Sequence, residues 1–177
     1  RRNHDDDGRK QQLADQVEIG AILTRTGATS MELARNFDAA YAATSYDEIL
    51  NDRDTDAVLI GTRHNLHTEM TLQPLRAGKH VLVEKPLAMT DYELAEVESY
   101  FSDSGENPPA LLTGFNRRFS PFIVKLKKLL DESGGPINMT YQMNAGYLPS
   151  THWLRTEEGG GKGRRGRTSV ASEDGGE

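Results

Sequence analysis

Short polar segments stand directly after apolar runs at three places in the sequence: Thr62-Arg63-His64, Glu84-Lys85-Pro86 and Asn116-Arg117-Arg118. In open α/β sheets, ligands bind at the carboxyl ends of the strands, where such segments would lie. Lys85 can present a cation to a bound cofactor or substrate, and Pro86 restricts the turn that carries it. The alternative is an exposed lysine that only solvates a strand end.

The histidines and the glutamate in and beside these segments could also take part in a functional site. His64 and His67 have the H-x-x-H spacing of some metal sites, but no second group of ligands accompanies them, so we predict no metal. We place both histidines on the cofactor side of a helix start. Glu84 either takes part in the site or pairs with a nearby cation, and the sequence leaves both open.

The elements that must position these residues alternate between strand-like and helix-like patterns. The strand-like apolar runs are Val17–Thr24, Ala57–Thr62, His80–Val83 and Ala110–Phe115. They are apolar on both alternations, as expected of parallel strands covered by helices on both faces. Strand–helix–strand alternation at this spacing predicts a Rossmann-like, doubly wound parallel α/β sheet.

The helix-like segments carry recognisable start signals. Possible capping boxes, in which a hydroxyl and a glutamate side chain cap the first turn, pair Thr29 with Glu32, Ser45 with Glu48, and Thr90 with Glu93. A further helix is expected over Asn65–Ala77. Pro74 lies inside it and predicts a kink or an early end, because proline lacks the backbone N–H.

The pattern changes after Arg118. A helical stripe from Phe122 to Leu130 is followed by strict alternation of apolar and polar residues over 137–144, which predicts a strand of an antiparallel sheet. We therefore expect a polar N-terminal segment (1–16) that is disordered or the remnant of a helix, and a partial dinucleotide-binding domain (17–118). The start of an α/β substrate domain (119–158) and a disordered, glycine-rich tail (159–177) should follow.

Composition narrows the range of partners. The formal net charge of −6 argues against nucleic acid, and the basic run at 162–167 sits in the glycine-rich tail. The chain has no cysteine, and no run of residues approaches the ~20 apolar residues of a membrane span. No signal-peptide pattern opens the sequence, so we expect no membrane partner and a cytoplasmic location.

With these elements in place, "GKHVLVEKPLAMT", the upstream "AVLIGTRHNLH" and the downstream "GFNRRFSP" resemble the glucose–fructose oxidoreductase/inositol dehydrogenase/rhizopine-catabolism family of NAD(P)-dependent oxidoreductases. The later "NAGYLPSTHW" resembles a branch associated with sugar metabolism, and the resemblance covers about Val17–Gly161. It implies NAD or NADP as cofactor and hydride transfer to or from a sugar- or polyol-like alcohol.

The resemblance also implies roles for individual residues. Lys85 would be catalytic and would help the substrate hydroxyl lose its proton. The cofactor-binding set would be Thr24, Arg25, Thr62, Arg63, His64, His67, Glu84, Lys85, Asn116 and Arg118. The segment Thr24-Arg25-Thr26 has no carboxylate for a ribose 2′-hydroxyl, so Arg25 either favours the 2′-phosphate of NADP or is simply an exposed arginine.

Two family features do not appear where they are expected. No Gly-x-Gly-x-x-Gly turn precedes Val17, since residues 1–16 contain only Gly8, and no histidine follows His152 to act from the second domain. We therefore expect an incomplete copy that lacks the first strand–helix unit and is inactive as this chain alone. The alternatives are a non-catalytic nucleotide-binding module and a non-functional fragment. An intact relative would be a possible homo-oligomer.

Overall fold

The computed structural model describes residues 17–142, 149 and 151–159. Its strands are β1 (Ala21–Ile22), β2 (Tyr41–Ala42), β3 (Ala57–Ile60), β4 (His80–Val83) and β5 (Leu111–Thr113). Its helices are α2 (Gly27–Asn36), α3 (Tyr46–Asn51), α4 (His67–Arg76), α5 (Asp91–Asp103) and α6 (Pro121–Ser133). Short 3-10 turns are η1 (His64–Leu66), η2 (Asn116–Phe119), η3 (Trp153–Arg155) and η4 (Glu157–Gly159).

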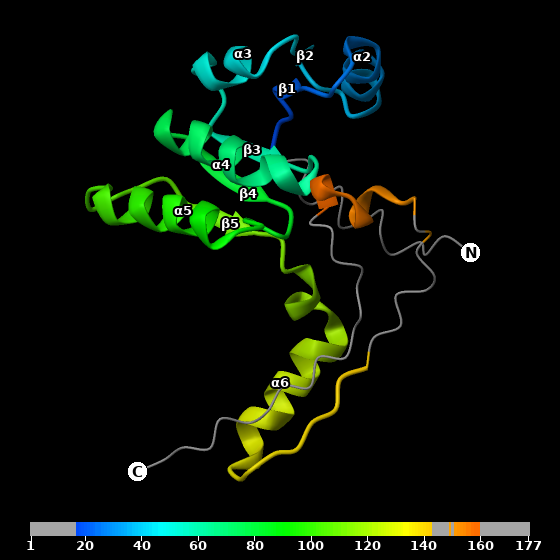
Figure 1. The fold of residues 1–177 in the computed structure, drawn as a ribbon, viewed down its shortest axis with the longest axis vertical. Coiled ribbons are helices and arrows are strands. Elements are labelled where there is room, and N and C mark those ends of the chain that lie inside the picture. Colours follow the sequence, from blue (N-terminus) through cyan, green and yellow to red (C-terminus); the bar gives the residue numbers. More distant parts are fainter. Residues whose placement is uncertain (1–16, 143–148, 150, 160–177) are drawn as a thin grey trace.

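The strands form parallel sheets with helical connections, which confirms the predicted Rossmann-like class (Figure 1). β1 pairs with β2, and β4 lies between β3 and β5. The register Val58 to Val81 and Ile60 to Val83 brings the carboxyl ends of β3 and β4 level with each other. The two sheets are not hydrogen-bonded to each other within the described residues. Residues 1–16, where the first strand–helix unit was predicted to be missing, lie outside that range.

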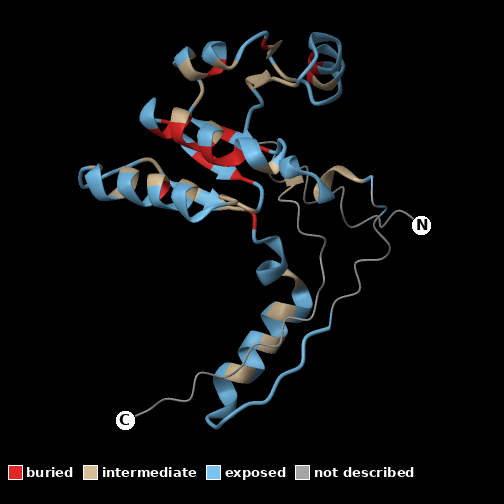
Figure 2. Ribbon diagram, viewed as in Figure 1, coloured by how far each residue is buried: buried red, intermediate tan, exposed pale blue. Residues whose placement is uncertain are grey.

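The main core lies between the three-stranded sheet and helices α4 and α5. Val58, Ile60, Val81 and Val83 are buried against Leu75, with Tyr100 and Phe101 of α5 at the margin (Figure 2). The side chains that alternate with them are exposed: Leu59 at 72%, Leu82 at 38% and Leu112 at 57%. The prediction that helices cover both faces of this sheet is therefore wrong for the described residues. Apolar residues on both alternations do not by themselves guarantee a covering layer.

Helix starts follow side-chain capping, although not always at the predicted residue. The Thr90–Glu93 capping box is complete. Ser45 caps α3 as predicted, but the Glu48 carboxylate turns to Thr44, accepting hydrogen bonds from its N–H at 2.9 Å and its hydroxyl at 2.5 Å. α2 begins at N-cap Thr26 instead of Thr29, because Thr26 is extended and its hydroxyl accepts the N–H of Thr29.

Pro74 does not end α4, which continues to Arg76. Of the two predicted outcomes, the early end is therefore wrong, and the kink stays a prediction. A proline at this position leaves the Met70 carbonyl without its usual i+4 donor. The Tyr46 hydroxyl supplies the replacement, donating to the Met70 oxygen at 2.7 Å. Burial raises the pKa of Tyr46 to about 12, so the hydroxyl keeps its proton at ordinary pH.

The segment after β5 combines a confirmed helix with residues 137–142, in which the predicted strand does not form. α6 begins at N-cap Ser120 and ends at Gly134, whose φ of 55° is left-handed. Residues 137–142 are not a strand, and residues 143–144 of the predicted strand lie outside the described residues. A strand needs a partner for its backbone groups, and no described strand pairs with this segment. The predicted domain boundary after Arg118 stays a prediction.

Candidate functional site

The polar segments gather at one edge of the three-stranded sheet. Because β3, β4 and β5 are parallel, Thr62, Glu84-Lys85 and Asn116 all follow carboxyl ends at that edge. The backbone N–H of Glu84 donates to the Ile60 carbonyl at 2.9 Å, which extends the β3–β4 pairing up to the site. The strand-end placement expected from the sequence is therefore present for these three segments.

The Glu84 carboxylate joins two of the strand ends. One oxygen accepts a hydrogen bond from the Asn116 side-chain amide at 3.3 Å, and the other accepts from the backbone N–H of Lys85 at 3.3 Å. Gly114 allows this approach, since a Cβ there would lie 3.1 Å from the Glu84 Oε2 atom. Glu84 thus orients its neighbours through amide groups. The Lys85 side chain itself is exposed and accessible to a ligand.

His67 lies beneath the site, not on its surface. The ring is 1% exposed, with Nδ1 2.7 Å from the Pro86 carbonyl oxygen and Nε2 3.1 Å from the Thr62 carbonyl oxygen. This burial leaves no ring surface for the direct cofactor contact that the sequence suggested. His67 instead fastens the turn after β3 to the turn that carries Lys85.

Thr24 and Arg25 follow β1 in the other sheet. The Thr24 N–H donates to the buried Ser30 hydroxyl at 2.8 Å, while Arg25 is exposed. No carboxylate stands in residues 23–26 or in the first turn of α2. This hydroxyl-rich turn, with Arg25 beside the N-terminus of α2, offers donors and positive charge to a phosphate and no carboxylate to a ribose diol.

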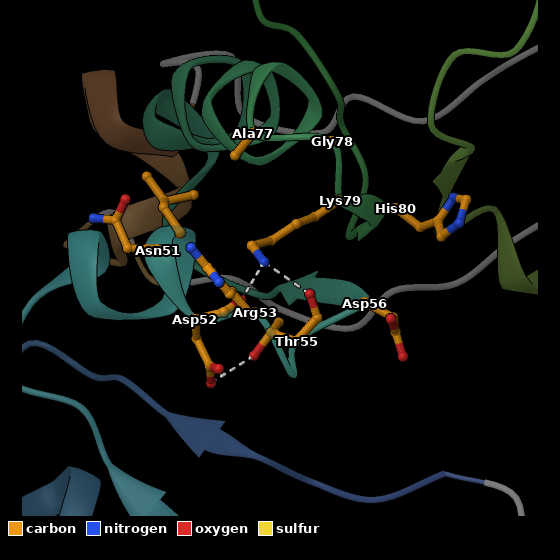
Figure 3. Close-up of a pocket in the computed structure, with 10 residues that line it drawn as sticks. Asn51, Asp52, Arg53, Thr55, Asp56, Ala77, Gly78, Lys79 and His80 are labelled. Carbon is orange, nitrogen blue, oxygen red and sulfur yellow. Dashed lines mark hydrogen bonds between the residues drawn. The ribbon is translucent and has the colours of Figure 1, made fainter.

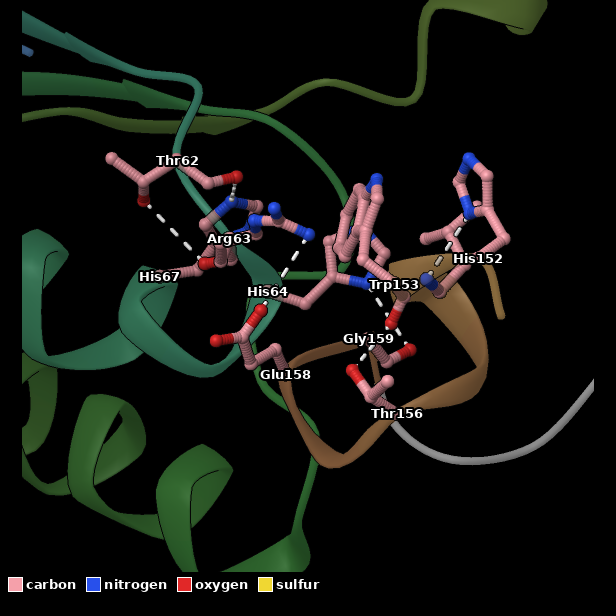
Figure 4. Close-up of polar contacts among 10 residues, drawn as sticks. Thr62, Arg63, His64, His67, His152, Trp153, Thr156, Glu158 and Gly159 are labelled. Atoms are coloured by element: carbon pink, nitrogen blue, oxygen red, sulfur yellow. Dashed lines mark hydrogen bonds and ion pairs between the residues drawn. The ribbon is translucent and has the colours of Figure 1, made fainter. Parts of the chain in front are cut away.

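Arg63 and His64 contact a segment that sequence reasoning did not connect with them (Figure 4). The Arg63 guanidinium carbon lies 4.4 Å from the centre of the Trp153 ring, and the guanidinium also pairs with Glu158 at 3.5 Å. His64 Nδ1 is 3.4 Å from the Gly159 carbonyl oxygen. No periodicity or spacing in the sequence signals a contact over about 95 residues. The lone tryptophan beside His152 was the only pointer to it.

Arg118 lies in η2, two residues after Asn116. Its backbone N–H donates to the Phe115 carbonyl at 3.3 Å within η2, and the residue is exposed. Within the described residues, no group of three or more histidine, aspartate or glutamate side chains is arranged to hold a metal ion. In that same range, no helix combines the length and the apolar character needed to cross a membrane.

A separate hollow lies at the opposite, amino-terminal end of β3 and β4 (Figure 3). Buried Lys79 is one of the residues that line it, and its ammonium donates to the carbonyl oxygens of Asp52 at 2.6 Å and Thr55 at 2.8 Å. The N–H of Asp54, then the hydroxyls of Tyr41 and Thr55, hold the pKa of Asp52 below its usual value. These contacts fix the loop before β3, so we assign this hollow a structural role.

Comparison with known proteins identifies the family. The model of the oxidoreductase family with an NAD-binding Rossmann fold matches residues 5–106. The chain belongs to this family. Its glycine turn was not found before Val17. Residues Gly161–Gly166 do match the Gly-x-Gly-x-x-Gly motif. They follow the 3-10 turn η4 in the sequence and not a strand, so the match is weak evidence for a phosphate-binding turn.

Family members similar to the chain include polyol dehydrogenases. It is 31% identical to scyllo-inositol 2-dehydrogenase (NADP(+)) of Bacillus subtilis, over 75% of this chain and 35% of that protein. It is 36% identical to 4-carboxy-2-hydroxymuconate-6-semialdehyde dehydrogenase of Sphingobium sp., over 60% of this chain and 33% of that protein. The chain thus spans about a third of the length of these relatives.

Solved structures agree with the family assignment. Levoglucosan dehydrogenase, in a complex with NADH and levoglucosan, is similar with a TM-score of 0.60 and 29% identity, over 65% of this chain and 30% of that one. GenD2 from gentamicin A biosynthesis, in complex with NAD, is similar with a TM-score of 0.59 and 27% identity, over 66% and 32% of the respective chains.

Proposed function

We propose that this protein is an NAD(P)-dependent oxidoreductase that acts on a sugar- or polyol-like alcohol. The observation that carries the proposal is the exposed Lys85 at the carboxyl end of β4, beside Thr62 and the Glu84–Asn116 pair. This edge of a parallel sheet is where doubly wound folds bind ligands. Family membership and relatives named as inositol dehydrogenases supply the reaction class.

The residues of this edge suit the chemistry in distinct ways. When bound, the nicotinamide exchanges a hydride with the substrate carbon. The Lys85 amine is positioned to hold the substrate oxygen and to assist the departure of its proton. Glu84 holds the Lys85 backbone and the Asn116 amide, and His67 holds the turn through Pro86 and Thr62. Both are positioning residues in this scheme.

The turn after β1 supports NADP over NAD as the preferred cofactor. Rossmann folds that use NAD commonly present an acidic residue to the ribose 2′-hydroxyl, whereas an arginine accommodates the 2′-phosphate. Here Arg25 stands in a turn without a carboxylate and next to the hydroxyls of Thr24 and Thr26. An arginine that contacts only solvent is the alternative, and the relative affinities of the two cofactors decide between them.

A second candidate is a nucleotide-binding module without turnover. Each histidine of the described residues has a ring nitrogen within hydrogen-bond distance of a backbone group: His64, His67, His80 and His152. His67 has both ring nitrogens occupied in this way and is buried, so within the described residues Lys85 is the exposed basic side chain that follows β4 at the strand-end site. Cofactor binding without oxidation of any polyol is the result that favours this candidate.

The test combines binding with turnover on the full chain. NADPH and NADH are titrated through their own fluorescence, and NADP⁺ reduction is then followed with a panel of inositols and sugars. Lys85→Met should abolish turnover and leave cofactor affinity within about threefold, whereas the matched Lys128→Met change on exposed α6 should alter neither. Binding without turnover selects the second candidate. If neither cofactor binds, both proposals are wrong.

A further inference from the structure

Residues 151–159, which we term the docked segment, form a compact unit of two short turns. The N–H of Arg155 donates to the His152 carbonyl at 2.9 Å, and that of Gly159 donates to the Thr156 carbonyl at 3.1 Å. The His152 ring caps the first turn by accepting the Leu154 N–H at 3.2 Å. The segment therefore has its own local structure apart from its contact with the Rossmann core.

The docked segment meets the core at the turn after β3. Arg63 contributes a cation–π contact with Trp153 and an ion pair with Glu158, while His64 packs its ring 4.9 Å from the Trp153 ring. The edge-on geometry of the two rings, with an interplanar angle of 71°, is a favourable aromatic arrangement. Trp153 is thus held on two sides by consecutive residues of one turn (Figure 4).

The contact surface continues toward Lys85. The His64 ring centre is 5.6 Å from that of His67, and His67 Nδ1 is 2.7 Å from the carbonyl oxygen of Pro86, the residue after Lys85. A chain of packed rings therefore connects the docked segment to the turn that carries the proposed catalytic lysine. The segment lies at the ligand-binding edge of the sheet and not on a remote surface.

We propose that the docked segment is a wall of the strand-end site, and that Arg63 is the positioning residue that seats this wall through Trp153 and Glu158. Arg63 is then not a ligand of the cofactor, contrary to its place in the set expected from the sequence. The location of the wall rests on the proposed function. The seating itself rests only on the contacts of Arg63.

Trp153 makes the seating directly measurable, because it is the only tryptophan of the chain. Acrylamide quenching of its fluorescence reports its accessibility with no ligand present. Arg63→Ala should raise the quenching constant at least twofold, and Arg63→Lys should have a smaller effect because lysine cannot stack as a plane. Arg76→Ala, at the exposed last residue of α4, should have none. An unchanged quenching constant in Arg63→Ala overturns the proposal.

Gly159 provides a way to displace the wall without touching Arg63. A Cβ at position 159 would overlap the Leu154 Cα and lie 2.7 Å from the Trp153 carbonyl oxygen, both inside the docked segment, so Gly159→Ala should disrupt the packing of η4 on η3 and with it the contact between Gly159 and His64. In that background, adding Arg63→Ala should weaken NADPH binding by less than twofold. A further tenfold loss would mean that Arg63 binds the cofactor directly and would overturn the proposal. If the wild-type chain binds neither NADPH nor NADH, the proposed function fails, while the quenching result still decides whether Arg63 seats Trp153.

Discussion

The hydroxyl of Tyr46 is the group whose removal tests the fold most directly. Pro74 cannot donate to the Met70 carbonyl, and Tyr46 donates to it instead at 2.7 Å. Tyr46→Phe keeps the ring but leaves this carbonyl unpaired inside α4. An unsatisfied buried polar group costs about 1–3 kcal/mol of unfolding free energy. A loss near 2 kcal/mol corresponds to a fall in Tm of about 4–8 °C for a domain of this size.

Thermal unfolding followed by circular dichroism measures this loss. Tyr92→Phe is the matched control, because Tyr92 is 74% exposed on α5 and should leave Tm unchanged. A Tyr46→Phe variant with wild-type Tm would refute the account of how α4 continues through Pro74.

The same hydroxyl predicts a dependence of stability on pH. Burial raises the pKa of Tyr46 from 10.0 to about 12, so the folded chain holds this proton more tightly than the unfolded chain. Its contribution to stability is therefore complete below pH 10 and is lost as the pH rises through 12. The pKa of Tyr41 is raised as well, first by burial and then by Asp52. Between pH 10 and 12, the unfolding free energy of Tyr46→Phe should accordingly fall by less than that of wild type. It should still fall to some extent, because Tyr41 remains.

Two further substitutions test local features. Thr90→Ala removes the hydroxyl of the complete capping box at the start of α5 and should cost about 1 kcal/mol of unfolding free energy, measured by urea denaturation. Thr90→Ser keeps a hydroxyl and should retain most of that stability. A cost as large for Thr90→Ser would point away from capping. Arg25→Ala should weaken NADPH binding about tenfold, or about 1.4 kcal/mol, and leave NADH unchanged, with Arg35→Ala on α2 as control. Equal effects on the two cofactors would exclude a 2′-phosphate contact.

The sequence predicted best those elements whose first and last residues are set by neighbouring residues in the chain. His80–Val83 forms β4 with the predicted bounds, because left-handed Gly78 precedes it and a polar segment follows it. The Thr90–Glu93 box marks α5 for a similar reason, since all of its atoms lie within four residues. At the site, the gathering of Thr62, Glu84 and Asn116 followed from the rule that parallel strands end at one edge.

The failures belong to features decided by distant residues. The Val17–Thr24 run yields only Ala21–Ile22 as strand, because a strand extends only as far as its partner β2 pairs with it. No residue near Pro74 in the sequence indicates that the hydroxyl of Tyr46, 28 residues earlier, donates a hydrogen bond to the Met70 carbonyl. The burial of His67 and the docking of Trp153 on Arg63 likewise depend on tertiary packing. The periodicity of apolar residues reports only local structure and does not predict such contacts.

The exposed leucines on the open face of the three-stranded sheet have a thermodynamic consequence. Leu59, Leu82 and Leu112 lie on the adjacent strands β3, β4 and β5 and offer water a contiguous apolar surface. A molecule that covers this surface and binds the folded chain more tightly than the unfolded one shifts the folding equilibrium by mass action. The melting temperature of this protein should therefore depend on the identity and the concentration of such molecules. A single Tm value then applies only to the solution in which it was measured.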